Sequence, residues 1–167
     1  MASVEDVKLI RTLARRKAEI GKLPIQAERF ELWRRLNRRE AVRPLVWINE
    51  IPWKELEAAR PDALKPRCGD PALHGIETAL RRELYQWDEF PGDMIVEPTW
   101  YVSIVGGPRG SYADYGVKED AHRKSGTHDV CYRPVIHTEE DVDRITTPKV
   151  WYDHEATEKG VRFAEEL

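Results

Sequence analysis

The sequence predicts an α/β protein in which two helices precede alternating strands and helices. Two short apolar runs, at residues 44–49 and 94–98, have the length of strands. Both runs are apolar on both faces, which is typical of parallel strands covered on both sides. Helical periodicity precedes and separates these runs, and this order of elements favours the α/β class.

The first 42 residues are expected to form a basic helical arm. Ser3 can cap a helix, with Asp6 three residues later as a variant of the capping box. An apolar stripe continues this helix until Gly21, and a second helix is expected at about residues 26–36. Since both helices precede the first strand, the arm is not part of a sheet.

Residues 43–167 are expected to hold the strands and the remaining helices. Asp70 followed by proline is a strong helix start. The run at 130–136 is predicted as a strand, which Pro134 confines to a sheet edge or a bulge. The other expected elements are a short helix at 53–60, a helix from Asp70 to about 87, a long loop at 99–128, a short helix at 139–145 and a last helix capped by Asp153.

Composition places the chain among globular proteins. It has 167 residues, of which 41% are hydrophobic and 34% charged. No apolar run approaches the roughly 20 residues of a membrane helix, so no membrane contact is expected. Cys68 and Cys131 lie far apart without CxxC spacing, which favours a reduced, cytoplasmic setting.

The net charge of −3 hides an asymmetry. Residues 1–43 hold 12 Lys and Arg against 6 Asp and Glu, a net of +6, whereas residues 44–167 hold 15 against 24, a net of −9. A basic segment can bind nucleic acid. In this arm the basic residues are mixed with glutamates and no aromatic residues interleave as stacking platforms, so docking on an acidic body or a partner subunit is favoured.

Polar side chains follow both apolar runs. Asn49 and Glu50 end the first run, Trp53 comes directly after, and Glu97 ends the second. In α/β sheets, ligands bind at the carboxyl ends of the strands. These residues are therefore the leading site candidates. The alternative is structural, with Glu50 capping the next helix and Glu97 paired with an arginine such as Arg81 or Arg109.

Two further patterns contain residue types that occur in metal or phosphate sites. His128, Cys131 and His137 form H-x2-C-x5-H, whose residue types suit zinc but whose spacing fits no known zinc signature. Residues 106–111, GGPRGS, are glycine-rich but lack the G-K-[ST] ending of a phosphate-binding loop. Ordinary loop and strand roles are favoured for both.

Several segments of the sequence resemble one known family. Four segments resemble, in their order and residue pattern, the uroporphyrinogen decarboxylase-like superfamily, in particular the branch found beside corrinoid methyltransfer systems. These segments are LWRRLN, RPLVWI, LRRELYQWDEFPGDMIVEP and EEDVDRITTP. The resemblance spans from about residue 10 to the end. It implies the N-terminal part of a TIM (β/α)8 barrel, preceded by the two-helix arm and incomplete in this chain, because such a barrel needs about 250 residues.

The resemblance also implies a chemistry, either decarboxylation or corrinoid-linked methyl transfer on a small-molecule substrate. Glu50 and Glu97 would orient the substrate or act as acid and base, His128 would transfer protons, and Asn49 and Trp53 would shape the pocket. The family's arginines that bind substrate carboxylates have no counterpart after the first strand, and no zinc ligand carries over, so a zinc or corrinoid cofactor is expected only with the full-length parent.

The partners expected on this basis are a corrinoid protein, a second-half chain or a second copy. Two open edges of an incomplete barrel would need such a partner. The competing interpretation is a non-enzymatic subunit or binding module that docks through its basic helical arm.

Overall fold

The computed structural model describes residues 2–90, 92–107, 115–118, 120–123 and 130–167. The chain divides into two compact units, Met1–Tyr101 with Leu167, and Val102–Glu166, which we call the first and second units. The structure is about 53% helical, and the strands of its described residues are four short ones in two separate two-stranded sheets.

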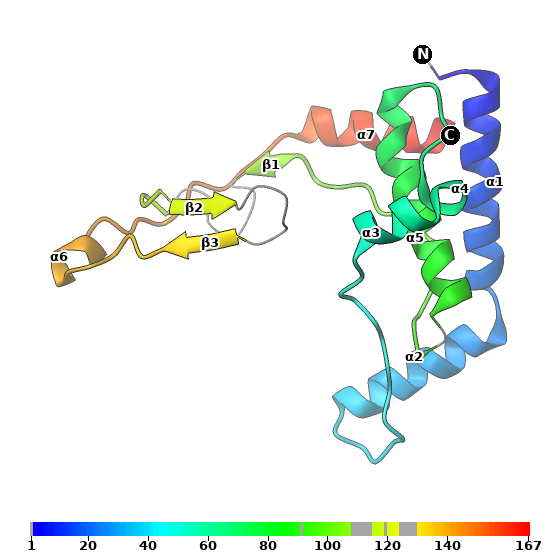
Figure 1. The fold of residues 1–167 in the computed structure, drawn as a ribbon, viewed down its shortest axis with the longest axis horizontal. Coiled ribbons are helices and arrows are strands. Elements are labelled where there is room, and N and C mark those ends of the chain that lie inside the picture. The colour runs from blue at the N-terminus through cyan, green and yellow to red at the C-terminus, as the bar shows by residue number, and fades with distance from the viewer. Residues whose placement is uncertain (1, 91, 108–114, 119, 124–129) are drawn as a thin grey trace. The chain divides into compact units, whose positions relative to one another are not determined.

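Helices make up the first unit (Figure 1). The capping box predicted at Ser3 is present, because the Ser3 hydroxyl accepts from the Asp6 amide and the Asp6 carboxylate accepts from the Ser3 amide. Asp70 also caps as predicted, but it starts a short 3-10 turn before the helix proper. The elements are α1 (Val4–Gly21), α2 (Pro24–Asn37), α3 (Trp53–Ala59), α4 (Pro61–Leu64), η1 (Pro71–Leu73) and α5 (His74–Glu89).

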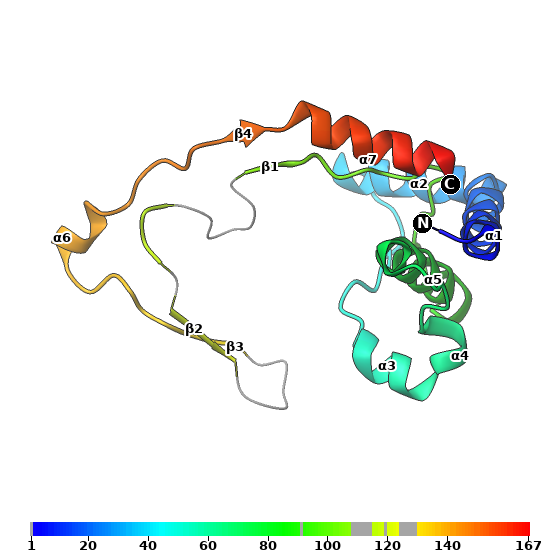
Figure 2. The ribbon, with the colours of Figure 1, turned by 90° about the horizontal axis from the view of Figure 1, so that it is seen from above.

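The α1–α5 pair holds the core of the first unit. The two helices lie side by side in both views (Figures 1 and 2) and run in the same direction, since Ile10 packs with Leu80 and Ile20 packs with Leu84 further along. Leu80 and Leu84 are 1% and 4% exposed. Full burial of one such side chain contributes about 1.5–3 kcal/mol, so these contacts are the main apolar source of stability.

The barrel predicted from the resemblance is wrong for this structure. The runs at 44–49 and 94–98, predicted as strands, are extended but belong to no sheet. They do touch each other, because the Asp93 amide donates to the Val46 carbonyl at 2.7 Å. A side chain on Gly92 would sit only 2.8 Å from that carbonyl, which explains a glycine there.

Side chains form hydrogen bonds with the main-chain groups that would bond to a neighbouring strand in a sheet. On α2, Gln26 accepts from the Val96 amide at 3.0 Å, Arg29 donates to the Met94 carbonyl at 2.9 Å, and Trp33 donates to the Asp93 carbonyl at 2.8 Å. We call these three residues the α2 clamp. Because the clamp already satisfies much of the backbone of residues 93–96, this run is stable without flanking strands.

In the part of the second unit that the structure describes there are four strands and two helices (Figure 2). β1 (Gly106–Gly107) pairs antiparallel with β4 (Trp151–Tyr152), and β2 (Asp120–Arg123) pairs antiparallel with β3 (Val130–Arg133). The strand predicted at 130–136 is thus confirmed up to Arg133 and ends before Pro134, as the missing proline donor requires. α6 (Glu139–Val142) is shorter than predicted, and α7 (His154–Glu166) follows β4.

Candidate docking surface

The predicted strand-end residues are exposed. Asn49 and Glu50 lie in the coil that leads to α3, and neither is joined to Glu97 by a hydrogen bond or ion pair. Glu97 accepts a 2.9 Å hydrogen bond from the Tyr101 hydroxyl, which raises the pKa of that phenol. The structure therefore does not gather these carboxylates into an enclosed site among the residues it describes.

The other predicted site residues have different positions. Trp53 packs on α5, with its ring 6.5 Å from that of Tyr85 and beneath the guanidinium of Arg82 at 5.2 Å. His128 lies outside the described residues. The helix cap predicted for Glu50 is absent, because α3 begins after Pro52 with no side-chain cap.

Arg81 pairs with Glu77 and not with Glu97, and Arg109 lies outside the described residues. Cys131 is exposed on β3, and the main-chain amide of His137 donates to Asp141 at 2.8 Å. Among the described residues, no three His, Cys, Asp or Glu side chains are grouped so as to hold a metal ion.

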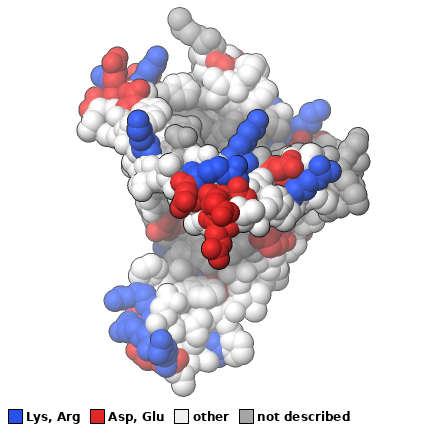
Figure 3. Space-filling model, turned by 90° about the vertical axis from the view of Figure 1, so that its left-hand side faces the viewer, with Lys and Arg blue, Asp and Glu red and all other residues white. Residues whose placement is uncertain are grey.

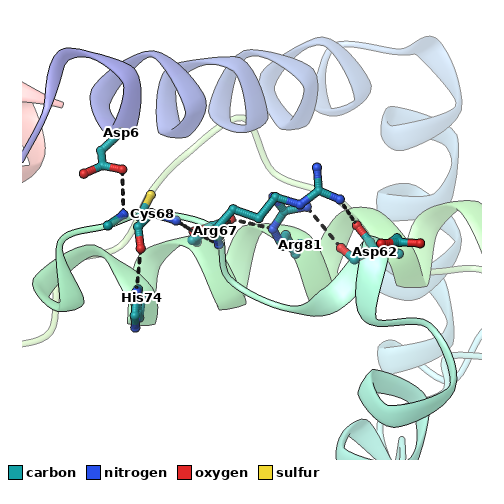
Figure 4. Close-up of polar contacts among 9 residues, drawn as sticks. Asp6, Asp62, Arg67, Cys68, His74 and Arg81 are labelled. Atoms are coloured by element: carbon teal, nitrogen blue, oxygen red, sulfur yellow. Dashed lines mark hydrogen bonds and ion pairs between the residues drawn. The ribbon is translucent and has the colours of Figure 1, made fainter.

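The strongest polar network is buried beside α5 and involves none of the predicted site residues (Figure 4). The Glu77 carboxylate is fully buried and accepts from the Arg67 and Cys68 amides at 2.8 Å each and from the Arg81 guanidinium at 2.7 Å. Burial alone would raise the pKa of Glu77, but these donors outweigh it and lower the pKa. Glu77 is therefore a buried anion that anchors the loop before η1.

A second carboxylate holds the same loop from α1. Asp6 accepts from the Gly69 amide at 2.8 Å, and this bond, with others to Ser3 and Asp70, lowers the pKa of Asp6. Cys68 is buried, and burial together with Glu77 raises the pKa of its thiol to about 12. A thiol with that pKa stays protonated at neutral pH, so this network is structural and not nucleophilic.

Sequence reasoning missed both this network and the α2 clamp. The signal for the first was present, because Glu77 and Arg81 are four residues apart on a predicted helix. The signal for the second was the spacing of Gln26, Arg29 and Trp33, which recur on one side of the second helix. The chain segments that they bind are distant in sequence and could not be identified from spacing.

The apolar run at 44–49, which was expected to be a covered strand, is exposed in part. Val46, Trp47 and Ile48 are 53%, 41% and 39% exposed. The Trp47 ring lies 6.1 Å from that of Trp33 on α2, and Phe30, one helical turn earlier, is also exposed. We call these five exposed or half-exposed residues together the Trp47 surface.

Basic side chains border the Trp47 surface. Arg34, Arg35 and Arg38 are at the end of α2, each with more than 40% of its side chain exposed. Figure 3 shows a cluster of Lys and Arg together with acidic side chains at the foot of its view, and Arg34, Arg35 and Arg38 each form an ion pair with Glu31 or Glu40. Apolar centres with polar rims are typical of protein interfaces.

Comparison with known proteins gives no match. No family model matches the chain, and neither a curated protein nor a solved structure matches it. Among the described residues, no helix has the length and apolar character needed to cross a membrane.

One prediction concerns Asp93, which holds the exposed run in place. Its carboxylate accepts from Arg43 and from the Val46 amide, and the Arg43 bond is the main cause that lowers the pKa of Asp93 to about 2. A depressed native pKa contributes stability above the unfolded value, about 3.9, which is lost as pH falls toward about 2. Asp93→Asn should lower the free energy of unfolding at neutral pH by about 2 kcal/mol.

Urea unfolding followed by far-UV circular dichroism checks this prediction. The difference between wild type and Asp93→Asn should shrink as pH falls from about 4 to about 2. Asp88→Asn is the matched control, since that exposed carboxylate pairs only with Arg16 on the surface. A pH-independent difference for the Asp93 variant would contradict the assignment.

Proposed function

We propose that this chain is a binding subunit that docks onto another protein through the Trp47 surface. The observation that supports this most directly is the exposure of Val46, Trp47 and Ile48. Consecutive residues of an extended segment point to opposite sides, so apolar side chains are open on both faces of this run. A partner that covers the run would gain about 25 cal/mol of binding free energy for each Å² of apolar surface that it removes from water.

Charge favours an acidic partner. Residues 24–43, which include α2 and the following loop, hold six arginines against three glutamates, a net of +3. Steering by complementary charge raises association rates and selects against partners of like charge. Pairing of two Trp47 surfaces with each other would bring two basic rims together and is disfavoured.

A second copy of the chain offers a surface of the required chemistry. Residues 138–158 hold seven Asp and Glu against two Lys and Arg, a net of −5. Val142, Ile145, Val150 and Trp151 in this stretch are all at least half exposed. The Trp47 surface of one copy therefore docks on residues 138–158 of another, in a head-to-tail association.

Sedimentation velocity over a range of concentrations tests this function. The wild type should show a mass above the monomer that grows with concentration. Val46→Ser with Ile48→Ser should abolish it, because both side chains are exposed and their loss removes apolar contact area. Val4→Ser, at a valine that is 82% exposed on α1, is the matched control and should associate as the wild type does.

Reversing the charges on either of the two surfaces tests whether they attract each other. Arg34→Glu with Arg38→Glu should weaken association, as should Glu139→Lys with Asp143→Lys on the acidic stretch. A mixture of the two reversed proteins should associate again, because each then presents the complementary charge. Wild-type protein that remains monomeric at all concentrations would contradict self-association, and unchanged mass in the Val46 and Ile48 variant would contradict the surface.

A second candidate function keeps the chemistry implied by the family resemblance. The hydrogen bond between Val46 and Asp93 brings the two apolar runs together, and an exposed carboxylate lies four residues after each bonded residue, Glu50 after Val46 and Glu97 after Asp93. Paired carboxylates can orient a substrate or act as acid and base. The reaction would be decarboxylation or corrinoid-linked methyl transfer.

Product analysis tests this second candidate. Uroporphyrinogen incubated with the protein should lose carboxyl groups, or free cobalamin incubated with a methyl donor should become methylated. Glu50→Gln and Glu97→Gln should each reduce turnover by about a hundredfold if they transfer protons. Lys54→Gln, next to α3's first residue, is the control. Turnover unchanged in both glutamate variants would overturn these roles.

A further inference from the structure

One edge of the apolar run at 44–49 is hydrogen bonded to the rest of the first unit. The Val46 amide donates to the Asp93 carboxylate at 2.9 Å, and the Val46 carbonyl accepts from the Asp93 amide at 2.7 Å. Further along, the Ile48 carbonyl accepts from the Gln86 side chain at 2.6 Å. Val46 and Ile48 thus use the same edge of the run, which we call its inner edge.

The opposite, outer edge of the run has a row of open main-chain groups. Because the main-chain groups of alternate residues in an extended segment point to opposite edges, those of Leu45, Trp47 and Asn49 face outward. Among the described residues, no hydrogen bond reaches the amide or the carbonyl of any of the three. An open strand edge is a template for pairing with another extended segment.

The outer edge of β4 is open in the same way. The Asp153 amide donates to the Val105 carbonyl at 2.8 Å, so Asp153 and, two residues earlier, Trp151 turn their main-chain groups toward β1. Those of Val150 and Tyr152 consequently point away from β1. No hydrogen bond to them occurs within the part of the chain that the structure describes, and both side chains are exposed.

We propose that residues 149–152 of one copy of the chain add as a strand to the outer edge of residues 45–49 of another copy. The inference rests on the proposed self-association and names the main-chain contact that it uses. Strand addition is a recurrent mode of recognition, in which main-chain hydrogen bonds give affinity and side chains give specificity. Pro148, which has no N–H to donate, limits the added strand at its start.

An antiparallel register aligns the outward residues of the two segments. With Trp47 opposite Val150, Leu45 lies opposite Tyr152, and each pair exchanges both of its main-chain hydrogen bonds. The side chains of such a pair lie on the same face of the sheet. Aromatic side chains therefore meet aliphatic ones in both pairs, and the contact buries apolar surface that each copy alone exposes.

Charge selects the antiparallel direction. A parallel arrangement with the same central pair would place Glu50 opposite Asp153, and like charges directly opposite each other destabilise a sheet. The antiparallel register instead places Lys149 opposite Ile48 and diagonal to Glu50. Long side chains reach across this diagonal, so the lysine and the glutamate attract each other.

Synthetic peptides of residues 146–154 test the main-chain bonds, with their binding to the full chain measured by fluorescence anisotropy. The unmodified peptide should bind and should lower the mass of the self-associated chain in sedimentation velocity. N-methylation of the Val150 amide should weaken binding about tenfold or more, because it removes an outward donor. N-methylation of the Trp151 amide is the matched control and should leave the affinity nearly unchanged, because that amide points to the other edge.

Disulfide trapping between two variants of the full chain tests the register. Both carry Cys131→Ser, which removes the exposed native thiol. Ile48→Cys mixed with Lys149→Cys should form a covalent heterodimer under mild oxidation, because opposite residues of antiparallel strands lie within disulfide range. Ile48→Cys mixed with Trp151→Cys is the control, since only the parallel arrangement would bring these two positions together.

The outcomes separate strand addition from the proposed function on which it rests. Equal weakening by the two methyl groups, or none by the one at Val150, would overturn strand addition, while a wild-type chain that still associates would uphold the proposed function. A wild-type chain that stays monomeric and does not bind the unmodified peptide would overturn both. A heterodimer in the control mixture and none in the first would overturn the antiparallel register.

Discussion

The fold of the first unit depends on one fully buried carboxylate. Glu77 binds the amides of Arg67 and Cys68 and the guanidinium of Arg81, and so joins the loop before η1 to the first turn of α5. A buried charge is stable only when its hydrogen bonds are complete. Asp6 holds the following residues of that loop from α1. The loop before η1 is thereby held to both helices of the core.

The same principle explains why the extended runs need no sheet. The α2 clamp binds residues 93–96, and Asp93 in turn binds Arg43 and the Val46 amide. In each of these contacts a side chain forms the hydrogen bond that the main chain of a neighbouring strand would form in a sheet. The outer sides of residues 46–48 receive no such cover, and that difference leaves them exposed where a core strand would be buried.

Local signals in the sequence predicted the helices well and the tertiary arrangement poorly. The Ser3–Asp6 box and the Asp70 cap are determined by neighbours within three residues, and both are present. The apolar run at 44–49 was predicted as a buried strand because its composition is that of one, but burial depends on distant segments. Trp53 was predicted at a binding site, and the structure packs it on α5. Glu77 was not identified, since its partners at 67 and 68 are set by a loop conformation.

Measuring the stability of Glu77→Gln tests this account most directly. The substitution keeps the shape but removes the charge, and it replaces one carboxylate oxygen, which accepts from two donors, by an NH2 group that cannot accept. Urea unfolding followed by circular dichroism should show a loss of about 3–5 kcal/mol. Asp88→Asn, whose ion pair with Arg16 is exposed, should lose less than about 1 kcal/mol. Equal stability of Glu77→Gln and wild type would show that the buried carboxylate does not organise the unit.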